Sequence, residues 1–250
     1  MDNPIDIREE GGVRYLHFGT DWVQGAMRLR NPHALELPYT REMMAGLLMR
    51  DAPWPRRVLS IGLGAGSLAK FIHARLPEAA HTVVEIEPRV VAIAHSCFQL
   101  PREDDRLRIH LADGLDFIAQ TDESWDLILL DAYDHDVRPG PLNAIAFYTA
   151  LRERLGDTGL LSVNLFNRSR RYDSTIARIG YAFDQRSLAF ASADQGNFIA
   201  FAATGQPVEV SATELRARAE EVHMATGLDL RPTVKRLIES NPATGDRLAL

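Results

Sequence analysis

The chain has 250 residues, 46% of them hydrophobic, a composition that supports a globular protein with a sizeable core. A net charge of −6 argues against an extended nucleic-acid surface, and the single cysteine, Cys97, excludes an intrachain disulfide and a cysteine-rich zinc site. No segment approaches the ~18 consecutive apolar residues of a membrane span, and the first residues lack a signal-peptide pattern. We therefore expect a cytoplasmic protein without membrane or nucleic-acid partners.

The first 50 residues predict a small N-terminal unit. Residues 12–19 and 22–29 have the pattern of two short strands around Gly19-Thr20-Asp21, which predicts a β hairpin. Residues 37–49 predict a helix, and Pro53 and Pro55 break the chain after it. We assign residues 1–50 to this unit.

From residue 51 strands and helices alternate. Strands are expected at 57–61, 81–86, 106–112, 125–130 and 160–165, with helices at 67–76, 88–98, 114–119 and 142–155 between them. A helix at 173–183 and two strands, 186–192 and 197–203, around Asp194-Gln195-Gly196 follow. This order predicts an α/β fold of residues 51–205: a doubly wound, Rossmann-like (methyltransferase-type), mostly parallel sheet ending in an antiparallel pair. Helical patterns at 211–225 and 231–239 make residues 206–250 a C-terminal helical tail.

A glycine-rich turn follows the first strand of this domain. Gly62, Gly64 and Gly66 alternate between an apolar strand and a helix, an arrangement that lets backbone approach a nucleoside closely. Tight turns also use glycine for purely structural reasons. Glu85, however, ends the next strand 19 residues after Gly66, close to the spacing at which an acid binds ribose hydroxyls. The pattern therefore predicts a nucleoside-binding site.

Further carboxylates follow the next two strands. Asp113 and Gly114 come after the third strand, and Asp131 and Asp134 after the fourth. Ligands of open α/β sheets bind beyond the carboxyl ends of the strands, although Asp113 can equally cap the next helix. Asp131 directly follows an apolar strand, so partial burial would raise its pKa toward that of a useful base. The histidines lack ligand spacing, and we expect no metal.

Several of these motifs, in order, resemble those of the spermidine synthase (polyamine aminopropyltransferase) family. They are Gln24, Pro38-Tyr39, Gly62-Leu63-Gly64-Ala65-Gly66, Val84-Glu85-Ile86-Glu87-Pro88, Ala112-Asp113-Gly114, Asp126-Leu127-Ile128-Leu129-Leu130-Asp131-Ala132-Tyr133-Asp134 and Phe147-Tyr148. Members of that family transfer an aminopropyl group from decarboxylated S-adenosylmethionine to a polyamine amine. The resemblance implies that this S-adenosylmethionine-type nucleoside is a co-substrate, with no tightly bound cofactor, and that the protein is a homodimer.

The resemblance also implies residue roles. Gln24, Glu85 and Asp113 would hold the nucleoside, together with the glycine turn and Gly114. Asp131 would deprotonate the attacking amine, and Asp134 and Tyr39 would help to place it.

Two departures from the family pattern keep other functions open. Ala65 stands where the family usually has an Asp that contacts the donor's amine, and Tyr39-Thr40-Arg41 replaces the usual Tyr-His-Glu. One alternative is methyl transfer from ordinary S-adenosylmethionine. Another is a non-catalytic nucleoside-binding protein.

Overall fold

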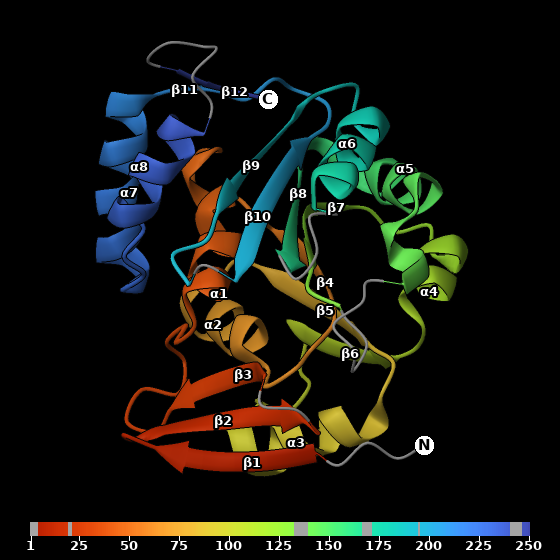
Figure 1. Cartoon of the computed structure of the whole chain (residues 1–250), viewed down its shortest axis with the longest axis vertical. Coiled ribbons are helices and arrows are strands. Elements are labelled where there is room, and N and C mark those ends of the chain that lie inside the picture. The colour runs from red at the N-terminus through yellow and green to blue at the C-terminus, as the bar shows by residue number, and fades with distance from the viewer. Residues whose placement is uncertain (1–4, 20–21, 133–139, 167–171, 195, 241–246) are drawn as a thin grey trace.

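The computed structural model describes residues 5–19, 22–132, 140–166, 172–194, 196–240 and 247–250. A small antiparallel sheet lies at the N-terminal end (Figure 1), with strands β1 (Ile5–Glu10), β2 (Val13–Phe18) and β3 (Val23–Arg28) in that order. The predicted hairpin corresponds to β2 and β3. The third strand, β1, was not predicted, because the apolar alternation of Ile5 and Ile7 ends in the polar residues 8–10.

The central sheet has seven strands in the order β6-β5-β4-β7-β8-β10-β9. They are β4 (Arg57–Ile61), β5 (Ala80–Glu85), β6 (Leu107–Leu111), β7 (Trp125–Leu130), β8 (Leu155–Phe166), β9 (Ser187–Ala191) and β10 (Asn197–Ala203). Strands β4 to β8 pair in parallel, and β10 pairs antiparallel with both β8 and β9. The predicted doubly wound sheet with an antiparallel end is confirmed.

The helices lie around this sheet (Figure 1). They are α1 (Pro38–Met43), α2 (Ser67–Arg75), α3 (Pro88–Phe98), α4 (Gly114–Gln120), α5 (Ile145–Glu153), α6 (Tyr172–Ala182), α7 (Ala212–Thr226) and α8 (Arg231–Glu239), with 3₁₀ turns η1 (Met44–Leu48) and η2 (Gly140–Asn143). The helix predicted at 37–49 tightens into η1 from Met44. Gly46 lowers helix propensity there and lies close to Leu160 and Phe201 of the sheet. The helix predicted at 142–155 divides similarly into η2 and α5.

Two apolar layers cover the two faces of the sheet. Along β7, Leu127 and Leu129 pack into one core cluster, and Ile128 and Leu130 pack into the other. This alternation follows from the two-residue period of a strand, and burial of both faces explains the uninterrupted apolar sequence. The first layer includes residues of α1, η1, α7 and α8, and the second includes residues of α5 and α6.

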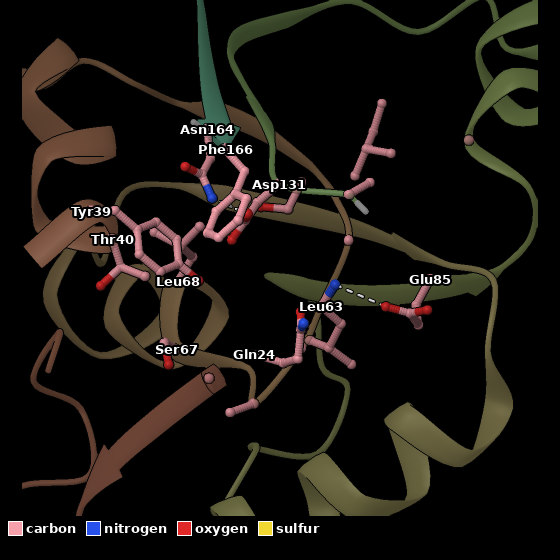
Figure 2. A pocket seen from close by; sticks show the side chains of 18 of the residues that line it. Gln24, Tyr39, Thr40, Leu63, Ser67, Leu68, Glu85, Asp131, Asn164 and Phe166 are labelled. Atoms are coloured by element: carbon pink, nitrogen blue, oxygen red, sulfur yellow. Dashed lines mark hydrogen bonds between the residues drawn. The ribbon is translucent and has the colours of Figure 1, made fainter. Parts of the chain in front are cut away.

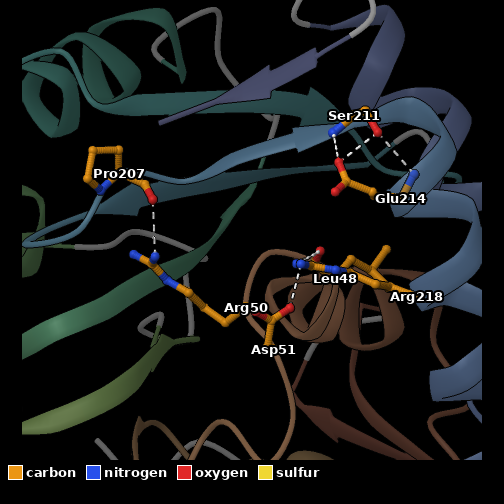
Figure 3. A network of polar contacts seen from close by, with 7 residues as sticks. All are labelled: Leu48, Arg50, Asp51, Pro207, Ser211, Glu214 and Arg218. Atoms are coloured by element: carbon orange, nitrogen blue, oxygen red, sulfur yellow. Dashed lines mark hydrogen bonds and ion pairs between the residues drawn. The ribbon is translucent and has the colours of Figure 1, made fainter.

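Polar contacts hold the C-terminal segment against η1 and the residues that follow η1 (Figure 3). Arg218 of α7 donates to the Leu48 carbonyl at 3.2 Å and pairs with Asp51. Arg50 donates to the Pro207 carbonyl at 3.2 Å. A capping box between Ser211 and Glu214 starts α7, and a short pair, β11 (Glu209–Ser211) and β12 (Arg247–Ala249), completes the segment. The domain boundaries at residues 50 and 205 stay predictions.

Among the described residues, no helix combines the length and apolar character needed to cross a membrane.

Candidate active site

The glycine turn after β4 leaves no room for larger residues. Gly62 has φ +98°, and a Cβ there would lie 2.2 Å from the Asp131 carbonyl oxygen. A Cβ on Gly64 (φ +53°) would lie 3.1 Å from the Gln24 carbonyl oxygen of β3. The turn therefore brings the N-terminal sheet and the end of β7 against the same loop.

Glu85 closes this loop from the neighbouring strand. Its Oε2 accepts the Leu63 N–H and its Oε1 accepts the Glu87 N–H, both at 2.9 Å (Figure 2 shows the former). Burial raises the pKa of this carboxyl, and three backbone N–H donors, those of Glu87, Leu63 and Ile86, act against that rise. A carboxylate has about four acceptor positions, so Glu85 shapes the loop and can still accept a further hydrogen bond from the cavity.

Asp113 caps the next helix, as one of its two predictions has it, and its ligand role stays a prediction. Its Oδ1 accepts the Leu115 N–H at 2.7 Å as the N-cap of α4, and the residue also lines the cavity described below. The next position requires glycine, because a Cβ on Gly114 would lie 2.7 Å from a side-chain carbon of Ile61. The helix cap and a cavity-lining position thus coincide at one residue.

Asp131 is held by side chains from two other elements. Asn164 of β8 donates its Nδ2 to Asp131 Oδ1 at 2.8 Å, and Tyr39 of α1 also hydrogen-bonds to the carboxyl. Burial raises the pKa of Asp131, and these two bonds lower it in part. Figure 2 shows Tyr39, Asn164 and Asp131 converging, with Glu85 farther along the same edge. This arrangement suits a base whose pKa must exceed that of an ordinary aspartate.

A second asparagine side chain extends the hydrogen-bonded group around Asp131. Asn197, at the start of β10, donates Nδ2 to Asn164 Oδ1 at 2.8 Å, and both asparagines are buried. An ionised carboxylate only accepts hydrogen bonds, so it fixes which way both amides face. The sequence analysis assigned neither asparagine to the site. The one available signal was Asn164 as a polar residue inside an apolar strand.

These residues line one cavity of about 610 Å³ at the carboxyl edge of the parallel strands. Its lining includes most of the predicted site residues: Gln24, Tyr39, Gly62, Gly64, Glu85, Asp113, Gly114 and Asp131. It also includes Trp22 and Phe166, whose rings meet edge to face at 5.2 Å. Among the described residues, no cluster of three or more His, Cys, Asp or Glu is placed to bind a metal.

Some predicted residues fall elsewhere. Gly66 (φ +69°) begins α2 and packs against Leu100, outside the cavity lining. Arg41 does not line the cavity either. Asp134 lies outside the described residues. Ala65 lines the cavity, but it is only 2% exposed. It packs closely against Gly25, because a Cβ added to Gly25 would lie 2.5 Å from the Cβ of Ala65.

Comparison with known proteins identifies the family. The spermine/spermidine synthase domain matches residues 37–167. The chain belongs to the spermine/spermidine synthase family. It is 36% identical to the polyamine aminopropyltransferase of Neisseria meningitidis over 98% of this chain and 93% of that protein.

Two solved structures support the fold. A probable spermidine synthase from Corynebacterium glutamicum superposes with a TM-score of 0.72 at 20% identity, covering 90% of this chain and 91% of that chain. Human methyltransferase-like protein 13 in complex with SAH superposes with a TM-score of 0.69 at 25% identity, covering 76% and 93%. The predicted methyltransferase-type architecture is therefore confirmed.

Proposed function

We propose that this chain is a polyamine aminopropyltransferase that transfers an aminopropyl group from decarboxylated S-adenosylmethionine to an amine of a polyamine. Family membership and a relative matched over nearly the full chain support a transferase of this type. Asp131 carries the proposal: a partly buried carboxylate, oriented by Asn164 and Tyr39, stands beside a nucleoside-type glycine loop.

The nucleoside would occupy the side of the cavity next to β4, β5 and β6. Glu85 would accept hydrogen bonds from the ribose hydroxyls, and Asp113 from the adenine amino group. Gly62 and Gly64 present backbone without side chains to the cavity, and Gln24 of β3 lines the cavity beside them. This assignment puts the sulfonium group near Gly62, next to Asp131.

The chemistry then needs one base. An alkyl amine is protonated at pH 7, so Asp131 first binds the ammonium group and takes one proton. The nitrogen lone pair attacks the propyl carbon bonded to sulfur, and the C–S bond breaks with its electron pair going to sulfur. The products are a protonated secondary amine and the neutral thioether methylthioadenosine. A sulfonium carbon is already activated, so orientation of the amine by Asp131 and Tyr39 is the main contribution of the protein.

The residue expected to contact the donor's amine is one of the two points at which this chain departs from the family pattern. Ala65 packs with Leu16, Met27 and Phe98, and no carboxylate occupies position 65 for the donor's amine. This departure keeps methyl transfer as the second candidate. Aminopropyl transfer is favoured because the relative matched over 93% of its length is an aminopropyltransferase.

Calorimetric titration with decarboxylated S-adenosylmethionine, S-adenosylmethionine and methylthioadenosine tests the donor, and chromatography with a linear diamine tests turnover. We expect tight binding of the decarboxylated donor and repeated release of methylthioadenosine. Release of a methylated amine with S-adenosylmethionine would instead establish methyl transfer. Absence of both products would leave a nucleoside-binding protein.

The remaining expectations rest on the resemblance and on composition. We propose a cytoplasmic homodimer with no tightly bound cofactor and no nucleic-acid partner. The net charge of −6 supports the last point, and equilibrium sedimentation would test the dimer.

A further inference from the structure

Strand β3 of the N-terminal sheet runs along the glycine turn. Near its start, the Gln24 carbonyl oxygen would lie 3.1 Å from a Cβ on Gly64. Two residues later, the Ala26 carbonyl oxygen accepts the hydroxyl of Ser67, the first residue of α2, at 3.1 Å. The part of β3 between these two contacts therefore lies directly against the turn.

The closest approach is between Gly25 of β3 and Ala65 of the turn. A Cβ on Gly25 would lie 2.5 Å from the Ala65 Cβ and 2.9 Å from the Ala65 backbone nitrogen. Both distances are well below the ~3.5 Å at which non-bonded heavy atoms attract one another. Gly25 has no positive φ, so the lack of space rather than the backbone conformation requires glycine here. Each of these two small residues leaves room for the other.

The surroundings of Ala65 are apolar. Its side chain packs in one cluster with Leu16 and Met27 of the N-terminal sheet and with Phe98 of α3. A charged side chain at this position would lose its hydration in that cluster unless β3 moved away from the turn. Position 65 is therefore part of the interface between the N-terminal sheet and the turn.

This interface also decides what β3 presents to the cavity. Gln24 precedes Gly25 in the chain, and both residues line the cavity together with Gly64 (Figure 2 shows Gln24). A change that moves β3 away from the turn consequently moves Gln24 as well. The place of Gln24 in the cavity thus depends on a contact between two residues without polar side chains.

We propose that Gly25 and Ala65 are positioning residues: their contact sets how closely β3 lies on the turn and so places Gln24 for the nucleoside. Position 65 serves this contact instead of binding the donor's amine. The inference rests on the proposed function, because it takes the nucleoside to lie beside the glycine turn.

Calorimetry with methylthioadenosine tests the positioning. Gly25→Ala adds a methyl group to a filled space, so the Kd should rise about tenfold. The kcat at saturating substrates should stay within about threefold of wild type. Ala65→Gly removes the facing methyl group, so the double variant Gly25→Ala, Ala65→Gly should recover part of the lost affinity. Gly156→Ala on β8, where the added Cβ would lie 3.8 Å from the nearest listed contact, the Trp125 carbonyl oxygen, is the matched control.

Ala65→Asp tests the second part of the proposal. Since the charged side chain does not fit the interface, methylthioadenosine and decarboxylated S-adenosylmethionine should both bind more weakly, by the same factor. Only the second of these ligands carries the amine. Selectively tighter binding of the decarboxylated donor would show that position 65 faces that amine, and would overturn the assignment.

A milder variant covers the case in which Gly25→Ala does not fold. Ser67→Ala removes the hydrogen bond to the Ala26 carbonyl at the other end of the interface. Loss of one neutral hydrogen bond predicts a Kd for methylthioadenosine raised about fivefold. An unchanged Kd in this variant would count against the docking of β3 as a determinant of nucleoside binding.

Urea unfolding without ligand tests the contact itself. Gly25→Ala should unfold at a lower urea concentration than wild type, and the double variant with Ala65→Gly should unfold at a higher concentration than Gly25→Ala alone. Equal midpoints for these two variants would reject the contact. A lowered midpoint with an unchanged Kd for methylthioadenosine would make the contact purely structural and reject the positioning role.

The same measurements separate this inference from the proposed function. A wild-type protein that binds methylthioadenosine but transfers no aminopropyl group would reject the transferase, and a weaker Kd in Gly25→Ala would still support the positioning role. An active enzyme whose Kd is unchanged by Gly25→Ala would retain the transferase and reject the positioning role. A wild-type protein that binds no nucleoside would reject both.

Discussion

The half of the cavity that we propose for the nucleoside and the half that we propose for the acceptor are built in different ways. The nucleoside half consists of the glycine turn and two acids, Glu85 and Asp113, at the ends of successive strands of the chain. Its oxygens are fixed by nearby backbone N–H groups, such as those of Leu63 and Leu115. The acceptor half is made of side chains from distant segments, with Tyr39, Asp131 and Asn164 meeting in one place.

We expect this difference to separate the residues that bind the nucleoside from those that act in catalysis. Backbone geometry fixes the nucleoside half, so single side-chain changes should weaken it moderately. The acceptor half depends on individual side chains and on the C-terminal helices behind them. Substitutions there should change turnover or acceptor binding and leave nucleoside binding alone.

The largest effect is expected for Asp131→Asn. Removing a general base costs ~10²- to 10⁴-fold, and we expect kcat to fall about 10³-fold while the Kd for methylthioadenosine stays unchanged. The reason is that, in the proposed mechanism, Asp131 faces the amine, one strand beyond the glycine loop. Steady-state kinetics and calorimetry measure the two quantities.

Glu85→Gln is the matched control in the other half. It should weaken methylthioadenosine binding about tenfold through a lost charged hydrogen bond and change kcat little. The contrast between halves would be wrong if Asp131→Asn kept kcat within tenfold of wild type.

The same difference decides what the sequence could predict. The strand-turn-helix unit and Glu85 lie within the 29 residues from Arg57 to Glu85, so local spacing was sufficient to find them. The predicted parallel sheet then placed Asp131 at the same edge. Asn197 and Glu42 carry no local signal, because their roles come from pairing across the sheet and from packing of α1 and α8.

The next largest effect is expected at the contact through which α8 supports the acceptor half. Arg236→Gln leaves Glu42, whose side chain is 2% exposed, as a buried charge without its partner. Removing one member of a buried pair costs about 3 kcal/mol, which urea unfolding would measure. Because Glu42 also accepts the Ala193 N–H, we expect a raised KM for the acceptor and no change for the donor.

Two further variants control this experiment. Arg231→Gln, which breaks exposed ion pairs on the same helix, should unfold at nearly the wild-type urea concentration. The double variant Glu42→Gln, Arg236→Gln removes both charges and should recover part of the lost stability. A stable Arg236→Gln protein with a raised donor KM would contradict the support of the acceptor half by α8.

The smallest effect is a shift in pH dependence. Burial raises the pKa of Asp131, so activity should fall as the pH drops through a value above that of an ordinary aspartate. Asn164→Leu removes a donor that favours the ionised form, so the pKa should rise further and activity should be lost at a higher pH. A charged hydrogen bond corresponds to about one pH unit in the acidic limb of kcat/KM. Asn197→Ala, one bond farther from Asp131, should shift that limb in the same direction by less. A shift of this acidic limb to lower pH in either variant would mean that the two amides do not hold Asp131 in its ionised form. It would also contradict the expectation that the acceptor half depends on individual side chains.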